Sequence, residues 1–373
     1  MLIKNAVVYM QDFEPHKTDV LIENGIISAL GDIDGDGIDC TGKCVIPGFI
    51  DIHIHGCNGA DATDGSAESI FTMSRRLAEN GITSFCPSTM TLPAEKLRAC
   101  FKSAARAAGK ETGAYIHGIN MEGPFISPAK SGAQESGYIT PPDFELFNEL
   151  NEICPIKLVA VAPEVDGAIE FARRASKICT ISAAHTDATY AEAACGFENG
   201  FTHATHLFNA MSGLGSREAG VVGAVLDSES VTAELICDGI HICPPTLRIA
   251  FKALGEDRIA VISDSTMAEG LEDGEYTLGG QRVIKKDAVR LPNGTLAGSC
   301  TNLFEEFKNL LHFGIPLRSA LKAVSINPAR IIGADKITGS IAVGKRADML
   351  IMSNDFSHIY NVIIKGKQFF PNK

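Results

Sequence analysis

The sequence predicts an α/β protein: a (β/α)₈ TIM-type barrel flanked by strand-rich segments at both ends of the chain. Three observations predict this class. Eight apolar, strand-like runs alternate with helical patterns through the middle of the chain. The segment that contains them, residues 47–335, is roughly 290 residues long, which suits such a barrel with modest insertions. Metal-binding types of side chain stand at the C-terminal ends of these runs, the face where such barrels carry their active sites.

The first 46 residues alternate short apolar runs with turn signals, as at Leu2–Met10, Asp19–Ile22 and Ile26–Leu30. This pattern predicts short antiparallel strands. The segment 336–373 has the same pattern, with runs at Met349–Met352, Tyr360–Ile364 and Gln368–Phe370. We therefore expect residues 47–335 to form the barrel.

The eight predicted barrel strands lie between helical patterns such as Ser69–Glu79, Ala94–Ala108 and Ala188–Cys195. The strands are Val45–Ile54, Thr83–Ser88, Tyr115–Met121, Lys157–Ala162, Thr180–Ala184, Phe201–Thr205, Ala233–Cys237 and Ile259–Ser263. After the eighth strand we expect a flap at Gly274–Leu291 and helices near Thr301–His312 and Leu317–Val324.

Composition excludes several classes of partner. No run approaches the roughly 18 consecutive apolar residues of a membrane span, and charged residues interrupt the N-terminus before a signal-peptide core can form. Eleven cysteines without C-x-x-C pairs suit a reducing compartment. The net charge of −12, without a basic cluster, argues against nucleic acid. We expect a cytoplasmic protein that binds neither membranes nor nucleic acids.

His53 and His55 end the first predicted barrel strand, within the segment Pro47–Gly56. Side chains two residues apart on a strand point to the same side, here into the mouth of the barrel. Two imidazoles so placed suit one divalent cation. An H-x-H pair by itself is common, and its position at the entry to the barrel is what favours a metal site.

Glu122, His185 and His206 follow the third, fifth and sixth predicted strands. A carboxylate at a buried strand end is costly unless it is paired or binds an ion. One carboxylate and two imidazoles form the open three-ligand pattern of a catalytic zinc-type site, with water in the fourth position. Asp264 follows the eighth strand and is a candidate for either a ligand or a catalytic base. His117 and His203 are out of phase with these ligands and are interpreted as structural neighbours.

These residues together resemble the amidohydrolase superfamily, and within it the deacetylases of N-acetylglucosamine 6-phosphate. The resemblance extends over almost the whole chain. It rests on the segments PGFIDIHIHG, MEGPF, AAHTDA, THLFNAM, GSREAGVVGA, CDGIH, SDST, LAGS and the tail GxIAVGKRAD. HLFNAM combined with EGPF is highly specific, whereas the tail segment marks only the superfamily.

The resemblance implies that the two chain ends form one small β-sandwich beside the barrel. It also implies roles for single positions: Glu122, His185 and His206 match the main metal ligands, and Asp264 matches the aspartate that moves protons. The positions that match substrate-binding stretches are Ala133, Gln134, Asn209, Ala210, Arg217, Asp238, His241, Leu296, Ala297 and Gly298. Arg217 is expected to reach the sugar phosphate bound by a neighbouring subunit, which implies a homodimer.

Two positions depart from the family pattern. Gln134 stands where many members have a histidine that contacts the substrate carbonyl, and Asn120 stands where many have another histidine. Glutamine can donate a hydrogen bond but not as an imidazolium, so we expect the metal to carry more of the oxyanion stabilisation. Asn120 is expected to affect strand packing only.

The implied reaction is the hydrolysis of N-acetylglucosamine 6-phosphate to glucosamine 6-phosphate and acetate, in amino-sugar catabolism. The alternative is a deacetylase or deaminase of another small substrate, phosphorylated or unphosphorylated. The cofactor is one or two divalent ions, with His53, His55 and Asp264 holding the second. Zinc is the first expectation, and iron, manganese and cobalt are the alternatives. Strand four lacks a suitably placed lysine, which weighs against cyclic-amide hydrolases.

Overall fold

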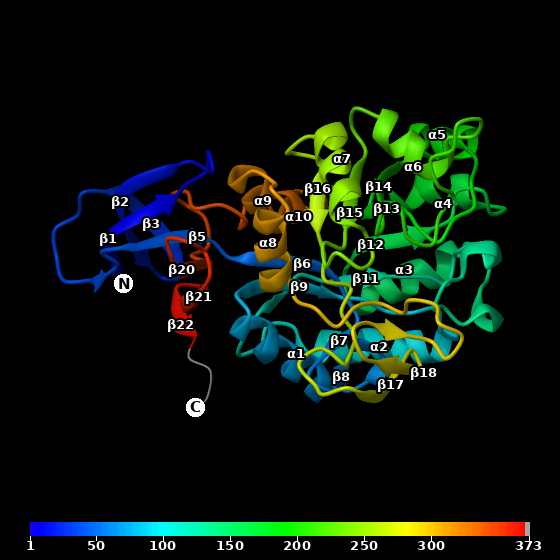
Figure 1. Ribbon diagram of the computed structural model, residues 1–373. Helices are drawn as coiled ribbons and strands as arrows, with labels where there is room; N and C mark the ends of the chain where they lie inside the picture. The colour runs from blue at the N-terminus through cyan, green and yellow to red at the C-terminus, as the bar shows by residue number, and fades with distance from the viewer. Residues whose placement is uncertain (370–373) are drawn as a thin grey trace.

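The computed structural model describes residues 1–369 and has two units, which Figure 1 shows side by side. The larger unit is a barrel built from the middle of the chain. The smaller unit is a sheet built from the blue N-terminal and red C-terminal ends. Within residues 1–369, the helices are too short or too polar to cross a membrane.

The small unit contains one mixed eight-stranded sheet in the order β22-β21-β20-β5-β1-β2-β3, with β4 paired to β1. The turn at Gly25 meets the turn at Gly366: a Cβ at Gly366 would lie 2.7 Å from the Gly25 Cα. The two ends of the strand order therefore meet, and the sheet folds over itself. Its strands are β1 (Leu2–Tyr9), β2 (Pro15–Glu23), β3 (Ile26–Gly31), β4 (Ile38–Asp39), β5 (Lys43–Pro47), β20 (Met349–Ser353), β21 (Ile359–Ile364) and β22 (Lys367–Phe369).

The folded sheet has a core of its own, which residues from both chain ends share. Ile3, Val8 and Ile27 pack in one cluster with Met349 and Ile363. Side chains on the other face, including those of Cys44 and Leu350, belong to the barrel core. Strand residues far apart in sequence therefore form a single unit because neither end alone can bury its apolar face.

The barrel strands run parallel in two arcs, β10-β9-β6 and β11-β12-β13-β14-β15-β16. The arcs meet through a bridge between Ser88 and Asn120 on one side, and on the other the Asp264 N–H donates to the His53 carbonyl at 3.0 Å. The strands are β6 (Phe49–Ile54), β9 (Ile82–Pro87), β10 (Tyr115–Ile116), β11 (Ile119–Met121), β12 (Ile156–Val161), β13 (Thr180–Ala183), β14 (Phe201–Ala204), β15 (Thr232–Leu235) and β16 (Ile259–Val261). The predicted barrel class is confirmed.

Two predicted strands are each broken in the structure. The run Val45–Ile54 divides at Gly48, because β5 pairs with β20 and β1 of the small sheet while β6 pairs with β9 of the barrel. A Cβ at Gly48 would lie 2.3 Å from the Thr83 side chain, so only glycine allows the crossing. The run Tyr115–Met121 divides because its two halves bond to different neighbours. The His117 N–H donates to the Phe85 carbonyl in β9, whereas the Ile119 N–H donates to the Pro155 carbonyl just before β12.

Helices cover the outside of the barrel between its strands (Figure 1). Local capping fixes several of their starts; Asp143 and Asn302 each accept two backbone N–H bonds, and Thr189 forms a capping box with Glu192. The helices are α1 (Ala67–Glu79), α2 (Ala94–Ala107), α3 (Phe144–Ile153), α4 (Ala168–Ala175), α5 (Tyr190–Glu198), α6 (Gly220–Asp227), α7 (Pro244–Leu254), α8 (Leu303–His312), α9 (Leu317–Val324) and α10 (Ile326–Ile331).

The predicted flap is a three-stranded antiparallel sheet of β17 (Gly274–Leu278), β18 (Gln281–Lys285) and β19 (Val289–Arg290). A second small hairpin, β7 (Gly56–Cys57) and β8 (Ala60–Asp61), follows the first barrel strand. The Gln281 side-chain amide donates to the Ala133 carbonyl at 2.6 Å. That bond ties the flap to a loop beside the barrel mouth, and Leu278 lines the cavity there.

Candidate metal centre and active site

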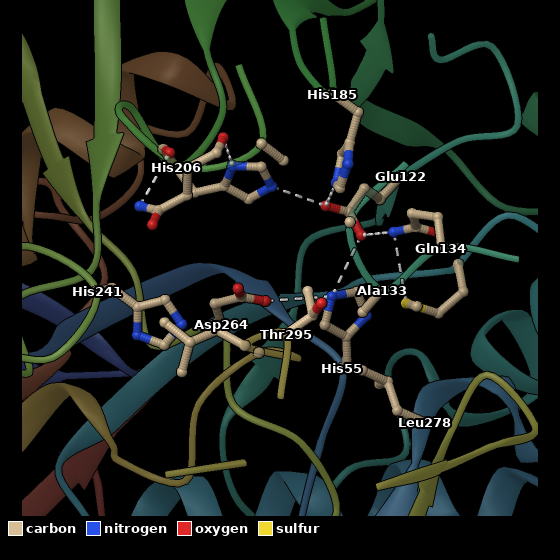
Figure 2. A pocket seen from close by; sticks show the side chains of 16 residues that line it. His55, Glu122, Ala133, Gln134, His185, His206, His241, Asp264, Leu278 and Thr295 are labelled. Atoms are coloured by element: carbon tan, nitrogen blue, oxygen red, sulfur yellow. Dashed lines mark hydrogen bonds and ion pairs between the residues drawn. The ribbon is translucent and has the colours of Figure 1, made fainter. Parts of the chain in front are cut away.

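A cavity of about 230 Å³ opens at the C-terminal ends of the barrel strands (Figure 2). Its lining includes five of the six predicted metal-ligand candidates, and the sixth, His53, lies fully buried beneath it. The full lining is His55, Met90, Glu122, Gly132, Ala133, Gln134, His185, His206, Asn209, Ala210, His241, Asp264, Leu278, Thr295, Leu296 and Gly298. The barrel therefore brings together side chains that are far apart in sequence.

Glu122 lies at the centre of the first group, with one carboxylate oxygen facing two imidazoles. Its Oε1 is 3.2 Å from the Nε2 atoms of both His185 and His206. The Nδ1 atoms of these histidines face the carbonyls of Lys130 and Asn209, at 2.9 and 3.1 Å. Because a carbonyl only accepts, each Nδ1 carries a proton, which leaves each Nε2 as the nitrogen that faces the carboxylate. Two imidazole nitrogens and one carboxylate oxygen thus converge at a spacing that a metal ion can fill.

His53, His55 and Asp264 form a second group of three buried ligand-type side chains. Asp264 Oδ1 is 3.2 Å from His55 Nε2 and 3.7 Å from His53 Nε2. The second oxygen of Glu122, Oε2, is 3.3 Å from His55 Nε2, and Oε1 is 3.4 Å from His53 Nε2. Glu122 thus faces both groups, and His53 Nε2 is a buried nitrogen without a hydrogen-bond partner among the described residues.

The two groups have the chemistry of divalent-metal sites. Their ligand atoms all lie within 4.8 Å of one another in each group. Ligands at about 2.1 Å from a tetrahedral ion stand about 3.4 Å apart, close to the separations of 3.2 Å at Glu122. Imidazole and carboxylate together suit zinc and other first-row divalent ions. The residues present therefore fit the expected divalent metal.

Charge interactions in the group are strong because the carboxylates are buried. Burial disfavours the charged form of Glu122, but His53, His185 and His206 outweigh burial and hold the pKa of the carboxyl well below its usual range. Burial also opposes the charged form of His55, and hydrogen bonds with Asp264 and Glu122 raise its pKa to about 9. Without a metal ion, the charges of Glu122 and Asp264 are balanced by protons on the neighbouring imidazoles. A metal ion takes the place of these protons, so metal binding should release them.

Three of the candidate ligands have a left-handed backbone conformation. The φ angles are 45° at His185, 30° at His206 and 47° at Asp264. Such a conformation costs about 1–2 kcal/mol for a residue with a side chain, and it persists where the surroundings hold it. The Asp264 N–H is held by the His53 carbonyl, and the His206 N–H by the Glu234 carboxylate at 3.2 Å. These turns at the strand ends direct the ligand side chains over the barrel mouth (Figure 2).

Glu234 is the main functional candidate that sequence reasoning missed. It is fully buried in β15, and its Oε2 lies 2.9 Å from His53 Nδ1. Burial raises the pKa of Glu234, but His53 and His203 outweigh burial and lower it to about 2. A glutamate inside the apolar run Ala233–Cys237 was the available signal, because a buried acid needs a partner.

Gln134 is enclosed in contacts within the protein. Its Oε1 accepts the Thr91 N–H at 2.6 Å, which fixes the orientation of the amide. Its Nε2 then faces Glu122 Oε2 at 2.6 Å and Met90 Sδ at 3.6 Å. Both N–H groups are therefore directed at protein atoms. A contact between Gln134 and a substrate carbonyl stays a prediction, and it requires this amide to share or change its partners.

Most of the predicted substrate-binding residues border the cavity, but three do not. Arg217 is exposed in the loop that leads to α6 and lies outside the lining. Asp238 Oδ2 is 2.7 Å from His241 Nδ1 and holds that ring at the cavity edge. Ala297 is buried, and its N–H donates to the Val289 carbonyl at 3.0 Å. The residues of this set that line the cavity are Ala133, Gln134, Asn209, Ala210, His241, Leu296 and Gly298.

Comparison with known proteins gives consistent matches over the whole chain. Residues 44–369 match the Amidohydrolase family. The N-acetylglucosamine-6-phosphate deacetylase of Bacillus subtilis (strain 168) is 39% identical over 88% of this chain and 85% of its own length. The N-acetylgalactosamine-6-phosphate deacetylase of Escherichia coli O157:H7 is 31% identical over 93% of both chains.

Among solved structures, a mutant of the N-acetyl-D-glucosamine-6-phosphate deacetylase from Mycobacterium smegmatis, in complex with N-acetyl-D-glucosamine-6-phosphate, superposes with a TM-score of 0.93. It is 27% identical, and the match covers 99% of this chain and 98% of that chain. The likeness therefore includes the small sheet as well as the barrel.

Proposed function

We propose that this chain, which belongs to the amidohydrolase family, hydrolyses N-acetylglucosamine 6-phosphate to glucosamine 6-phosphate and acetate. The observation that carries this function is the pair of buried ligand groups around Glu122, with Asp264 at the same cavity. Named deacetylases of phosphorylated amino sugars, at 31–39% identity, supply the substrate class.

Glu122, His185 and His206 would hold one divalent ion, and His53, His55 and Asp264 a second. Zinc is our first choice of metal, with iron, manganese and cobalt as alternatives. A divalent ion at this position supplies Lewis acidity, which makes water nucleophilic near neutral pH and polarises an amide carbonyl. The protein contributes the fixed ligand positions and a cavity that Leu278 of the flap helps to line.

Asp264 acts as the general base and then as the general acid. Its carboxylate takes a proton from the attacking water as the water oxygen bonds to the acetyl carbon. The same carboxyl group then delivers that proton to the sugar nitrogen as the C–N bond breaks. Acetic acid and a free amine result, and the acid's proton then passes to the amine or to solvent, so atoms and protons balance and acetate leaves. Burial raises the pKa of Asp264, but hydrogen bonding to His55 and charge interactions with His53 outweigh burial and lower it, which keeps the carboxylate ready to accept a proton.

His241 and Arg217 are the proposed phosphate ligands. His241 lies at the cavity edge, with its Nδ1 held by Asp238. The guanidinium of Arg217 can bind two phosphate oxygens at once. Within residues 1–369 this side chain makes neither an ion pair nor a contact with its own cavity, which supports a role across a dimer. We propose that Arg217 completes the site of a neighbouring subunit.

The substrate assignment is tested with three acetylated sugars under one condition. Acetate release from N-acetylglucosamine 6-phosphate should exceed release from N-acetylglucosamine by at least about 10² in kcat/KM, because charged hydrogen bonds are lost. Equal rates would remove the phosphate assignment and favour an unphosphorylated substrate. N-acetylgalactosamine 6-phosphate is the second candidate because a relative with that activity covers 93% of this chain, and a higher kcat/KM for it would replace the first assignment.

Mixed dimers test whether Arg217 acts across the interface. One subunit carries Arg217→Ala and the other carries Asp264→Asn, with different affinity tags, and mixed dimers are purified through both tags. If Arg217 acts in the neighbouring site, one of the two sites is intact and the mixed dimer keeps about half of the wild-type activity. If Arg217 acts within its own subunit, both kinds of site are defective and activity is not restored. A monomeric protein would yield no species with both tags, which would also refute a role across a dimer.

A further inference from the structure

Glu234 joins the two candidate metal groups from below the cavity. One carboxylate oxygen, Oε2, is 2.9 Å from His53 Nδ1 and accepts the His206 N–H at 3.2 Å. The other oxygen, Oε1, is 3.3 Å from His203 Nε2. Glu234, His53 and His203 are each fully buried. The carboxylate therefore contacts the ring of one candidate ligand, the backbone of another and a histidine that belongs to neither group.

The contact with Glu234 decides which nitrogen of His53 carries a proton. An ionised carboxylate only accepts hydrogen bonds, so His53 Nδ1 donates and Nε2 is the nitrogen left for a metal ion. Nε2 lies 3.4 Å from Glu122 Oε1 and 3.7 Å from Asp264 Oδ1. His55 has no such support, because its Nδ1 is buried without a partner among the described residues. Within the second group, only His53 has both its tautomer and its ring orientation fixed by a carboxylate.

His203 is the second histidine that faces Glu234. Its Nε2 is 3.3 Å from Glu234 Oε1, and its Nδ1 is 2.7 Å from the Thr232 hydroxyl. The Thr232 hydroxyl also donates to the Thr202 carbonyl at 3.2 Å. Contacts at both ring nitrogens therefore hold His203 beside the carboxylate that faces His53.

We propose that Glu234 is a positioning residue that fixes His53 as a ligand of the second metal ion. The proposal rests on the function assigned above, in which divalent ions occupy both groups. Metal-bound imidazoles usually donate their other nitrogen to a carboxylate or carbonyl, and removal of that partner commonly weakens metal binding 10- to 100-fold. The ion held by His53, His55 and Asp264 should depend on Glu234 more than the ion held by Glu122, His185 and His206.

The test compares metal binding in Glu234→Leu, Glu234→Gln and a matched control, Glu306→Gln. Glu306 is a second fully buried glutamate, on α8, and it bonds to the Cys237 N–H rather than to a histidine. Each protein is stripped of metal and titrated with zinc against a chromophoric chelator, which gives separate dissociation constants. The melting temperature of the metal-free protein is measured alongside.

We expect the wild type and Glu306→Gln each to bind two ions, and each ion to bind both proteins with similar affinity. Glu234→Leu should bind one ion about 10- to 100-fold more weakly while the other changes less. Glu234→Gln should stay within about tenfold of wild type, because its amide oxygen still accepts from His53. The proposal would be overturned if Glu234→Leu bound both zinc ions as tightly as the wild type, or if its affinity for both ions fell by the same factor. A wild-type protein that binds only one ion would also overturn it.

A wild-type protein that binds no divalent ion would instead overturn the proposed function itself. If Glu234→Leu does not fold, ¹⁵N NMR of histidine-labelled, zinc-loaded wild type tests the same point. The His53 signals, identified by their loss in His53→Asn, should report a protonated Nδ1 and a metal-bound Nε2. The opposite assignment would overturn the positioning role of Glu234.

Discussion

Replacing Asp264 with asparagine removes the proposed proton carrier with little change in shape. The backbone of Asp264 is held on both sides, by the His53 carbonyl at 3.0 Å and by the Ser299 N–H at 2.7 Å. The residue is only 7% exposed, so a side chain of the same size has little room to move elsewhere. The amide can still face His55, which lies 3.2 Å from Oδ1 in the wild type.

The expected loss follows from the chemistry that asparagine cannot perform. A positioned general base contributes about 10²–10⁴ to the rate, which corresponds to about 3–5 kcal/mol of activation free energy. The amide cannot take up the proton of the attacking water or return it to the sugar nitrogen. Asp264 therefore affects kcat more than KM, because the phosphate contacts lie elsewhere in the site.

The assay measures acetate release in parallel with metal content per subunit and the melting temperature. Asp61→Asn is the matched control: Asp61 is also buried, but its carboxylate binds Thr63 and lies outside the cavity lining. We expect the control to stay within about twofold of wild type and Asp264→Asn to fall by about 10² or more. Wild-type turnover in Asp264→Asn would refute the reasoning. Full recovery with excess metal would show that Asp264 acts only as a ligand.

Three further predictions concern the metal, Gln134 and His117. Chelation should abolish activity and lower the melting temperature by several degrees, because a ligand at 1,000 times its Kd stabilises by about 4 kcal/mol; unchanged activity would exclude a metal-dependent reaction. Gln134→Leu should lower the free energy of unfolding by about 1–3 kcal/mol, since the Thr91 N–H and Glu122 Oε2 lose their partner, and an unchanged urea midpoint would contradict those contacts. Burial, with Arg346, Lys157 and Lys365, lowers the pKa of His117 to about 3, so the unfolded chain binds a proton that the folded protein does not. The contribution of His117 to the free energy of unfolding is fully present above about pH 6.5 and falls by about 2 kcal/mol between pH 7 and pH 5. In urea unfolding over this range, His117→Gln should therefore lose about 2 kcal/mol less stability than the wild type. An equal pH dependence of stability in the two proteins would refute the assignment.

The order of elements in the barrel was predictable because each strand is a short apolar run and most helices have clear amphipathic patterns. Thr180–Ala184 and Ile259–Ser263, for example, correspond to β13 and β16 within two residues. Periodicity could not reveal that Val45–Ile54 serves two sheets, because both halves are equally apolar. That division depends on which partners each half meets, namely β20 and β9.

The candidate ligands were predictable for a different reason. Histidines and acids at the ends of buried strands are costly unless they have a common partner, so their types and places in the strand pattern already indicate a metal. Their geometry was not predictable: the left-handed turns at His185, His206 and Asp264 are held by contacts with distant parts of the chain, namely Ser127, Glu234 and His53.

By itself, then, the sequence determined the barrel class, the strand ends that carry chemistry and the ligand-type residues there. The tertiary structure alone decided that Gln134 is bonded to Glu122 and Thr91, and that Glu234 supports His53. The physical reason is that strand and helix patterns depend on neighbours in sequence. Contacts such as that between His53 and Glu234, 181 residues apart, exist only once the barrel closes.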